Sequence, residues 1–278
     1  MKKKRVLACL LAVILFVSSI GLAAGAEEEN TKEDTLAAPS AILMEANTGM
    51  ILYEKNPDEK RPCASITKVM TLLLVMEALD DGKIALSDMV SASEHAASMG
   101  GSDIWLKPGE SMSVDDLLKA TVIASANDAA VALAEYVSGS EEAFLNQMNQ
   151  RAKELGMTNT VFKNCNGLDE EGHVTTARDV AIMSRELIKH KKIFDYSQTW
   201  IDYLRDGQTQ LVNTNKLLKT YNGITGLKTG TTGKAGSCIS ATAGRGGVSP
   251  FAGVLGCANT KGRFSSAAFP LGQGSAHW

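Results

Sequence analysis

Cysteine and histidine, the residues that most often build cross-links and metal sites, are scarce in this sequence. Its 278 residues include 5 cysteines and 4 histidines, without a Cys-x-x-Cys pair or a ligand-like histidine spacing. Neither a zinc site nor a dense disulfide framework is therefore indicated, and no metal or organic cofactor is predicted. One or two disulfides are possible among four cysteines whose pairing the sequence alone does not determine: Cys63, Cys165, Cys238 and Cys257. The histidines are expected on the surface or in loops: His95, His173, His190 and His277.

An excess of positive charge is also missing. The formal net charge is −3 at pH 7, and no stripe of basic residues runs along the chain. Binding to nucleic acid is therefore not expected. No internal repeat or low-complexity segment is present.

The one hydrophobic run that approaches membrane-spanning length lies at the N-terminus. Basic residues 2–5 precede apolar residues 6–20, and Ala24-Gly25-Ala26 offers small residues for cleavage, a pattern typical of a secretory signal peptide over residues 1–26. An uncleaved anchor is the alternative, and membrane association is predicted only in that case. Cleavage would change the net charge from −3 to −7 for the remaining 252 residues, because it removes four positive charges and no acidic ones. We therefore expect an exported, extracytoplasmic protein.

Beyond residue 26, the pattern of apolar and polar residues divides the chain into segments with different expected secondary structure. Residues 27–37 are acidic and polar, which favours a flexible leader, and order is expected from near Ala38. Two apolar runs at 40–45 and 50–55 flank an Asn-Thr-Gly turn and predict a β-hairpin. Helices are expected to dominate residues 65–190, and strands are expected at 200–204, 210–212, 224–228, 238–243 and 251–256. We therefore predict an α+β fold, a mainly antiparallel β-sheet flanked by helices, with an inserted all-helical subdomain at about 83–195.

The first candidate for chemistry is Ser65, at the start of an apolar helix expected to run to about Leu79. Lys68 follows three residues later, so both side chains lie on one helix face within reach of each other. Burial lowers the pKa of a lysine, and a neutral amine can take the proton of a nearby hydroxyl. The pair therefore indicates an activated serine nucleophile, with an ordinary helix N-cap as the alternative for Ser65.

Two later motifs place residues that disfavour regular structure where a helix or a strand is expected. Ser125-Ala-Asn127 interrupts two helical stretches, and a simple helix-to-helix turn is the plainest interpretation, because both side chains compete for helix hydrogen bonds. Lys228 opens a Lys-Thr-Gly-Thr-Thr-Gly run where a strand is expected, although glycines weaken strands unless a ligand or another backbone comes close. A lysine and a hydroxyl beside free strand backbone suit a substrate carboxylate. The alternative is a charged edge strand with a bulge.

Taken together, Ser-x-x-Lys, Ser-x-Asn and Lys-Thr-Gly in this order resemble the signature of the penicillin-recognising serine enzymes. The chain is similar, more narrowly, to the low-molecular-weight D-alanyl-D-alanine carboxypeptidases of bacteria in several segments: 39–49, 61–71, 125–130, 166–169, 176–179 and 226–230. The resemblance covers roughly residues 38–263. It implies a catalytic domain with the β-lactamase and DD-peptidase fold over that range.

The resemblance also implies a role for each motif residue. Ser65 would attack the carbonyl of the penultimate D-alanine of a peptidoglycan stem peptide, with Lys68 as the base. Ser125 would relay a proton to the leaving amine, and Asn127 would orient Lys68 and the substrate amide. The substrate would be bound by Lys228, Thr229, Gly230 and Thr231, the first two holding the terminal carboxylate. Backbone N–H groups of Ser65 and Thr231 would form the oxyanion hole, and β-lactam antibiotics would acylate Ser65 as substrate mimics.

Two departures from the family pattern stand out. Cys63 lies two residues before Ser65, where a proline or another small residue is expected, and we predict that it is a small buried hydrophobe. In residues 264–278, a helix is expected to begin at Phe264 and to stop at Pro270. We therefore expect a truncated, atypical tail without a second β-rich domain, and hypothesise a weakened closing layer on the sheet.

Two alternative functions remain open. A class A-like β-lactamase needs a water-activating glutamate in a Glu-x-x-x-Asn context, whereas the 155–172 loop offers Asn164, Asn166 and Asp169, and Glu154 falls at the end of a helix. The other alternative is a catalytically impaired protein that binds peptidoglycan or penicillin without turnover.

Overall fold

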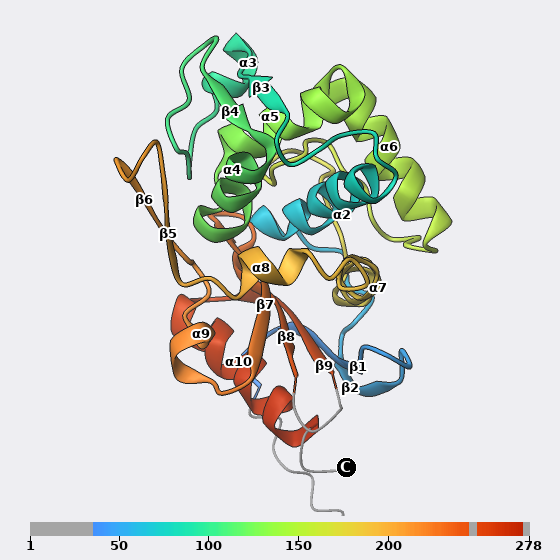
Figure 1. Cartoon of the computed structure of the whole chain (residues 1–278). Helices are drawn as coiled ribbons and strands as arrows, with labels where there is room; N and C mark the ends of the chain where they lie inside the picture. Colours follow the sequence, from blue (N-terminus) through green and yellow to red (C-terminus); the bar gives the residue numbers. More distant parts are fainter. Residues whose placement is uncertain (1–35, 245–248, 275–278) are drawn as a thin grey trace, which may run out of the picture. The chain divides into compact units, whose positions relative to one another are not determined.

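A five-stranded antiparallel sheet lies at the centre of the computed structural model, which describes residues 36–244 and 249–274 (Figure 1). The strand order is β2-β1-β9-β8-β7. The strands are β1 Ser40–Glu45, β2 Ile51–Lys55, β7 Ile224–Thr232, β8 Gly236–Ala243 and β9 Pro250–Cys257. The predicted α+β fold with an antiparallel sheet is confirmed, and β7, which carries the Lys-Thr-Gly motif, forms one edge of that sheet.

Two short antiparallel ribbons lie outside the central sheet. Strand β3 (Met89–Ser91) pairs with β4 (Ser111–Ser113), and β5 (Ile201–Leu204) pairs with β6 (Thr209–Val212). The second ribbon matches the strands predicted at 200–204 and 210–212. Strands β3 and β4 were not predicted, because three residues are too few to show a two-residue period.

Helices predominate in the segment between β2 and β5, as the sequence predicts, but the subdomain at about 83–195 is not all-helical because it contains β3 and β4. A 3₁₀ turn, η1, precedes α2, and a π-helical turn, η2, follows α4. The bounds are η1 Ala64–Thr67, α2 Lys68–Asp80, α3 Glu94–Ala97, α4 Val114–Lys119, η2 Ala120–Ala124, α5 Asn127–Ser138, α6 Glu141–Glu154, α7 Ala177–Leu187, α8 Ile193–Ser197, α9 Leu217–Thr220 and α10 Thr260–Gly274.

Local sequence explains where three of these helices begin. Ser113, Ser140 and Thr176 lie just before α4, α6 and α7, and each hydroxyl accepts a hydrogen bond from the backbone N–H three residues later. Such caps satisfy N–H groups that have no partner within the helix, and each contributes about 1 kcal/mol.

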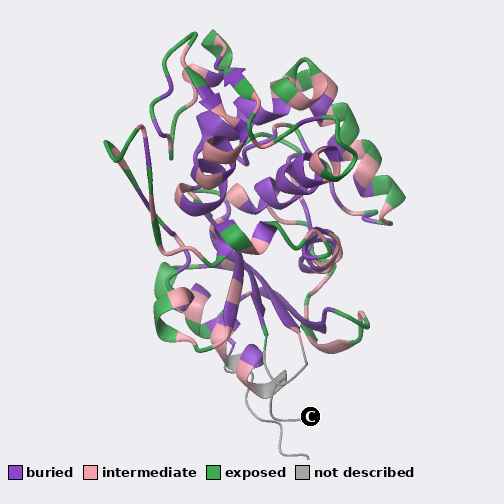
Figure 2. Ribbon diagram, in the orientation of Figure 1, coloured by how far each residue is buried: buried purple, intermediate pink, exposed green. Residues whose placement is uncertain are grey.

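The two faces of the central sheet bury different sets of side chains. In β1, Ile42 and Met44 join the larger apolar cluster, which includes α2, α5 and α7, whereas Ala41 and Leu43 join the smaller one, which includes Ala267 and Leu271 of α10. Successive strand residues point to opposite faces, so α7 covers one face and α10 covers the other. Figure 2 shows that α2 and the inner strands of the sheet are largely buried, whereas the edge strand β2 is intermediate or exposed.

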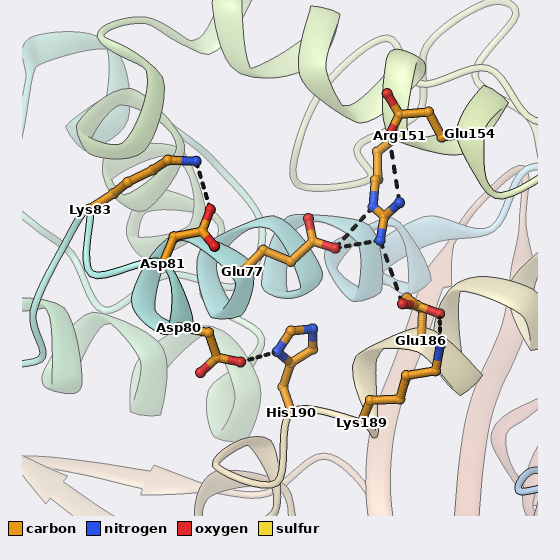
Figure 3. A network of polar contacts seen from close by, with 9 residues as sticks. All are labelled: Glu77, Asp80, Asp81, Lys83, Arg151, Glu154, Glu186, Lys189 and His190. Carbon is orange, nitrogen blue, oxygen red and sulfur yellow. Dashed lines mark hydrogen bonds and ion pairs between the residues drawn. The ribbon is translucent and has the colours of Figure 1, made fainter.

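A polar network fixes α2 against α6 and α7 (Figure 3). Arg151 of α6 donates to Glu77 of α2 from Nε at 2.9 Å and from Nη2 at 2.7 Å, and Nη2 lies 3.5 Å from Glu186 of α7. Near the end of α2, Asp80 accepts a hydrogen bond from His190. These side chains are partly exposed, so each pair contributes up to about 1 kcal/mol. Their main effect is to orient the helix that begins with Lys68.

Two details at the chain ends differ from prediction. Helix α10 does not stop at Pro270 but continues to Gly274. Proline removes one helix hydrogen bond, yet burial of Leu271 against the sheet holds the last turn in place. Within the flexible leader predicted for 27–37, Leu36 is buried, and residues 27–35 lie outside the described part of the chain. The signal peptide predicted for 1–26 lies outside the described residues.

Candidate active site

Ser65 lies in the 3₁₀ turn η1, one residue after a left-handed backbone conformation at Ala64, whose φ is 51°. Helix α2 follows at once and is buried along nearly its whole length, including Lys68, which is 0% exposed. The predicted helix from Ser65 to about Leu79 is therefore present, with its first turn in 3₁₀ form. Ser65, in η1, is partly exposed to solvent, whereas the Lys68 amine is buried.

The Lys68 amine is surrounded by three oxygen atoms. Its Nζ lies 3.1 Å from Ser65 Oγ, 2.5 Å from Asn127 Oδ1 and 2.7 Å from the carbonyl oxygen of Asn166. Complete burial lowers its pKa to about 7 through desolvation, and the negative charges of neighbouring acidic groups oppose that shift. A substantial fraction of Lys68 is therefore a neutral base at neutral pH.

Ser125 and Asn127 lie where a π-helical turn gives way to α5. Ser125 closes that turn with a left-handed conformation, φ 64°, and Asn127 is the first residue of α5. The Asn127 amide is held at both ends, since Oδ1 accepts from Lys68 and Nδ2 donates to the carbonyl of Gly100 at 2.6 Å. The motif is thus a helix junction, which agrees with its plainest interpretation, and its Asn127 also contacts Lys68.

Strand β7 brings the third motif beside the Ser65 turn. The amide nitrogen of Ser65 is so close to Gly230 that a Cβ added there would lie 2.8 Å from it. This close approach between backbones is the reason that glycine is needed in this strand. Residues 228–231 are therefore placed next to Ser65 on an edge strand, as the carboxylate-receptor interpretation requires.

Lys228 and Thr229 differ in their surroundings. Lys228 is 1% exposed, and burial lowers its pKa well below the usual range, with further lowering by the nearby charges of Lys68 and Arg263. An arriving carboxylate would favour the charged form of this lysine. Thr229 Oγ1 donates to Thr214 Oγ1 at 2.6 Å, which orients the threonine side chain.

Several contacts at the site come from residues that the motifs do not include. Arg263 of α10 donates from Nη1 to the carbonyl of Gly230 at 3.1 Å and to Thr231 Oγ1 at 2.9 Å. The Asn166 carbonyl binds Lys68, and Asp169 accepts from Thr232 Oγ1 at 2.6 Å. Segment 166–169 is one of those that resemble the family, but the sequence assigns no contact to its residues or to Arg263, because a backbone carbonyl or a distant arginine becomes part of a site only through folding.

The cysteines and His173 complete the surroundings of Ser65. Cys63 is 1% exposed, and burial raises the pKa of its thiol to about 11, which agrees with the predicted small buried hydrophobe. Cys63, Cys165, Cys238 and Cys257 are all unpaired thiols, so no disulfide joins them. His173 was expected in a loop or on the surface; it does lie in a loop but is 4% exposed, with Nε2 2.7 Å from Thr67 Oγ1.

The architecture and site place the chain in a class of known structures. Penicillin binding protein 5 from Haemophilus influenzae matches with a TM-score of 0.81 and 32% identity, covering 87% of this chain and 71% of that one. Penicillin-binding protein D2 from Listeria monocytogenes, in its ampicillin-bound form, matches with a TM-score of 0.78 and 32% identity, covering 87% and 98%. The fold is that of the penicillin-binding DD-peptidases.

Sequence similarity identifies the family within this class. The model of the D-alanyl-D-alanine carboxypeptidase family matches residues 27–259. D-alanyl-D-alanine carboxypeptidase DacF from Bacillus subtilis is 50% identical over 265 residues, which cover 94% of this chain and 68% of the relative. The chain belongs to the D-alanyl-D-alanine carboxypeptidase family, a family of serine peptidases.

Proposed function

We propose that this protein is a serine DD-carboxypeptidase that removes the terminal D-alanine from peptidoglycan stem peptides. The observation that carries the proposal is the arrangement around Lys68. Carbonyl oxygens accept hydrogen bonds and cannot donate them, so Asn127 Oδ1 and the Asn166 carbonyl take the two N–H bonds of a neutral amine. The lone pair is then left for Ser65 Oγ, 3.1 Å away.

The reaction begins with transfer of the Ser65 proton to Lys68 while Oγ bonds to the carbonyl carbon of the penultimate D-alanine. Ser125 relays this proton from Lys68 to the amine of the terminal D-alanine as the C–N bond breaks, so that free D-alanine leaves and Lys68 is neutral again. An acyl-enzyme ester on Ser65 remains. Water then attacks this ester while Lys68 takes its proton and passes it to Ser65 Oγ as the ester bond breaks, which restores the serine and releases the shortened stem peptide.

Strand β7 supplies recognition of the substrate. The terminal carboxylate is held by Lys228 and by the Thr229 hydroxyl, which turns its hydrogen from Thr214 to the carboxylate when the substrate binds. The pairing with Lys228 is charge-assisted and therefore stronger than one between neutral groups. The N–H groups of Ser65 and Thr231 stabilise the oxyanion that forms as Oγ attacks; the loss of one such donor costs about 3 kcal/mol in other enzymes. The close approach of Gly230 to Ser65 supports this role, because it brings the two backbones together. A β-lactam carries a carbonyl and a carboxylate at comparable positions and acylates Ser65 in the same way.

The position of Glu154 favours a peptidase over a class A-like β-lactamase. Glu154 is exposed at the end of α6, where it pairs with Gln150 and Arg151. Where the 155–172 loop meets Lys68, it presents the backbone carbonyl of Asn166. Fast hydrolysis of a penicilloyl ester needs a carboxylate to activate water, so we expect slow release of bound penicillin.

The place of action follows from the substrate. Peptidoglycan lies outside the cytoplasmic membrane, and export through the signal peptide at residues 1–26 would deliver the protein there. Among the helices that the structure describes, none has both the length and the apolar character to span a bilayer.

Two measurements test the proposal. Intact-mass spectrometry after incubation with benzylpenicillin is expected to show one penicilloyl adduct, mapped to Ser65 and missing in Ser65→Ala. Release of D-alanine from a Lys-D-Ala-D-Ala peptide is expected from the wild type alone. An adduct without D-alanine release would identify a penicillin-binding protein without carboxypeptidase activity, and the absence of both would refute the proposal.

A further inference from the structure

The β5–β6 ribbon has an unusual distribution of apolar side chains. Its inner face contains Leu204 and Leu211, which are 2% and 1% exposed. The outer face is formed by two cross-strand pairs, Ile201 with Val212 and Tyr203 with Gln210. When one face of an antiparallel ribbon is buried, the other is normally polar, yet three of these four residues are large and apolar, with exposures of 42% for Ile201, 50% for Tyr203 and 43% for Val212. We define the hairpin face as Ile201, Tyr203, Gln210 and Val212.

The base of the ribbon is hydrogen-bonded to the active site. Thr214 lies two residues after Val212, and its hydroxyl accepts the hydrogen bond from Thr229 of the Lys-Thr-Gly motif. The Thr214 N–H donates to the carbonyl of Ile123, just before Ser125. The hairpin face is therefore connected to both motifs through a short, hydrogen-bonded segment.

The tip of the ribbon reaches a second exposed aromatic residue. Arg205 donates from Nη1 to the carbonyl of Ile104 at 3.0 Å and from Nε to Glu110 at 2.7 Å. The residue after Ile104 is Trp105, which is 78% exposed and has a left-handed backbone with φ 55°. A tryptophan in that conformation is strained.

The strained backbone at Trp105 is held from both sides. The carboxylate of Asp128 accepts from the N–H of Ile104 at 3.2 Å and from the N–H of Leu106 at 3.0 Å. Asp128 directly follows Asn127, and it is buried. The fold therefore fixes the Trp105 backbone to the segment that contains Asn127. Because the indole is exposed, its own packing does not explain why this backbone is held.

We propose that the hairpin face and Trp105 form a contact surface for the glycan strand of the substrate. The proposal rests on the proposed carboxypeptidase function. Exposed apolar side chains that gather on a surface mark a site of interaction, and here they lie on the β5–β6 ribbon and on the segment that Arg205 ties to its tip. Figure 1 shows this ribbon extending away from the sheet beside α4. All five side chains are uncharged, which suits a sugar polymer better than a charged stem peptide. Aromatic rings pack on the apolar faces of sugar rings, while the Tyr203 hydroxyl and the Gln210 amide, 2.9 Å apart, offer hydrogen bonds to sugar hydroxyls.

Activity on two substrates tests the proposal. Trp105→Ser and the double variant Ile201→Ser/Tyr203→Ser are compared with wild type on a Lys-D-Ala-D-Ala peptide and on intact peptidoglycan. We expect unchanged kcat/KM on the peptide and a loss of about tenfold on the polymer, the size expected for one or two lost aromatic contacts. Met89→Ser serves as the control, because Met89 is 62% exposed in another ribbon. An equal loss on both substrates, or none on the polymer, would overturn the proposal, whereas a wild type inactive on both would instead refute the carboxypeptidase function.

Binding identifies what the surface contacts. Ser65→Ala is co-sedimented with insoluble glycan strands from which all peptides have been removed, with and without Tyr203→Ser. Retention that Tyr203→Ser abolishes supports the glycan. Retention only on peptide-bearing material, or a concentration-dependent dimer in sedimentation velocity that Tyr203→Ser disrupts, would assign the surface to the stem peptide or to a second copy of the chain and overturn the proposal.

Discussion

Gly167 lies directly against the carbonyl of Ala64, so that a Cβ added to Gly167 would be 2.0 Å from the Ala64 oxygen and 2.9 Å from the Ser65 nitrogen. The φ of Gly167 is 90°, a conformation that L side chains rarely adopt. This contact packs the loop that carries the Asn166 carbonyl against the turn that carries Ser65. The geometry of the nucleophile therefore depends on a glycine about 100 residues later in the chain.

Gly167→Ala is expected to lower stability by at least about 3 kcal/mol, in the range of severe steric substitutions, and to abolish penicillin acylation. Gly82→Ala is the matched control, because Gly82 also has a positive φ, 68°, but nothing lies within 4 Å of an added Cβ. That control should cost only about 1–2 kcal/mol from backbone strain. Thermal unfolding and intact-mass spectrometry measure the two effects. Equal destabilisation by both variants would show that the contact with Ala64 has no special importance.

The pH dependence of acylation should report the ionisation of Lys68. Because its pKa is lowered to about 7, the neutral base accumulates above that pH. The second-order rate constant for penicillin acylation is expected to rise as pH increases through about 7 and then to level off. Lys68→Arg keeps a permanent positive charge and should lower the rate by about 10²–10⁴-fold, the usual contribution of a general base. A rise centred above pH 9 would indicate that the amine titrates as an ordinary lysine.

Arg263 is expected to act as a positioning residue for β7. It lies 5% exposed on α10, and its Nη1 donates to Gly230 and Thr231. Arg263→Met should slow acylation by about tenfold or more, because it releases the strand that provides the Thr231 N–H. Arg263→Lys, which keeps one donor and the charge, should recover part of the rate. If both variants reduced stability equally while acylation of the folded fraction stayed normal, the role of Arg263 would be structural only.

His173 should make stability depend on pH in the acid range. The N–H of Lys163 donates to Nδ1, so Nε2 carries the proton and donates to Thr67. Burial lowers the pKa of His173 to about 4 from 6.5. In the unfolded chain His173 is therefore protonated below about pH 6.5, whereas in the folded chain it is protonated only below about pH 4. Stability should fall as pH decreases across this window, by an amount on the order of 3 kcal/mol.

Chemical denaturation at several pH values measures this effect. His173→Gln should lose the part of the slope between pH 6.5 and 4 that this residue causes, although it also removes a buried contact near Ser65. His95→Gln provides a comparison at an exposed histidine, whose side chain is 52% exposed. An identical slope in His173→Gln and wild type would contradict the assignment.

The three motifs and the helix caps were predictable because each depends only on residues that are close together in the sequence. Ser65 and Lys68 are three residues apart, so helical geometry alone brings them together. The caps at Ser113, Ser140 and Thr176 are equally local. The order of the segments, a hairpin followed by a block of helices and by returning strands, correctly predicted an antiparallel sheet.

Contacts between distant segments could not be predicted in this way. The Asn166 carbonyl, the glycine beside Ala64 and the guanidinium of Arg263 meet the site only because the loops and α10 pack against it. The burial of His173 and the passage of α10 through Pro270 were missed for the same reason, since tertiary packing overrode a local preference. The sequence by itself determined the motif side chains to which the proposal assigns the chemistry. Tertiary packing decided that Lys68 is buried and that Asn127 Oδ1 and the Asn166 carbonyl oxygen accept its hydrogen bonds. Both conditions arise only when segments distant in the sequence pack together and exclude water from the amine.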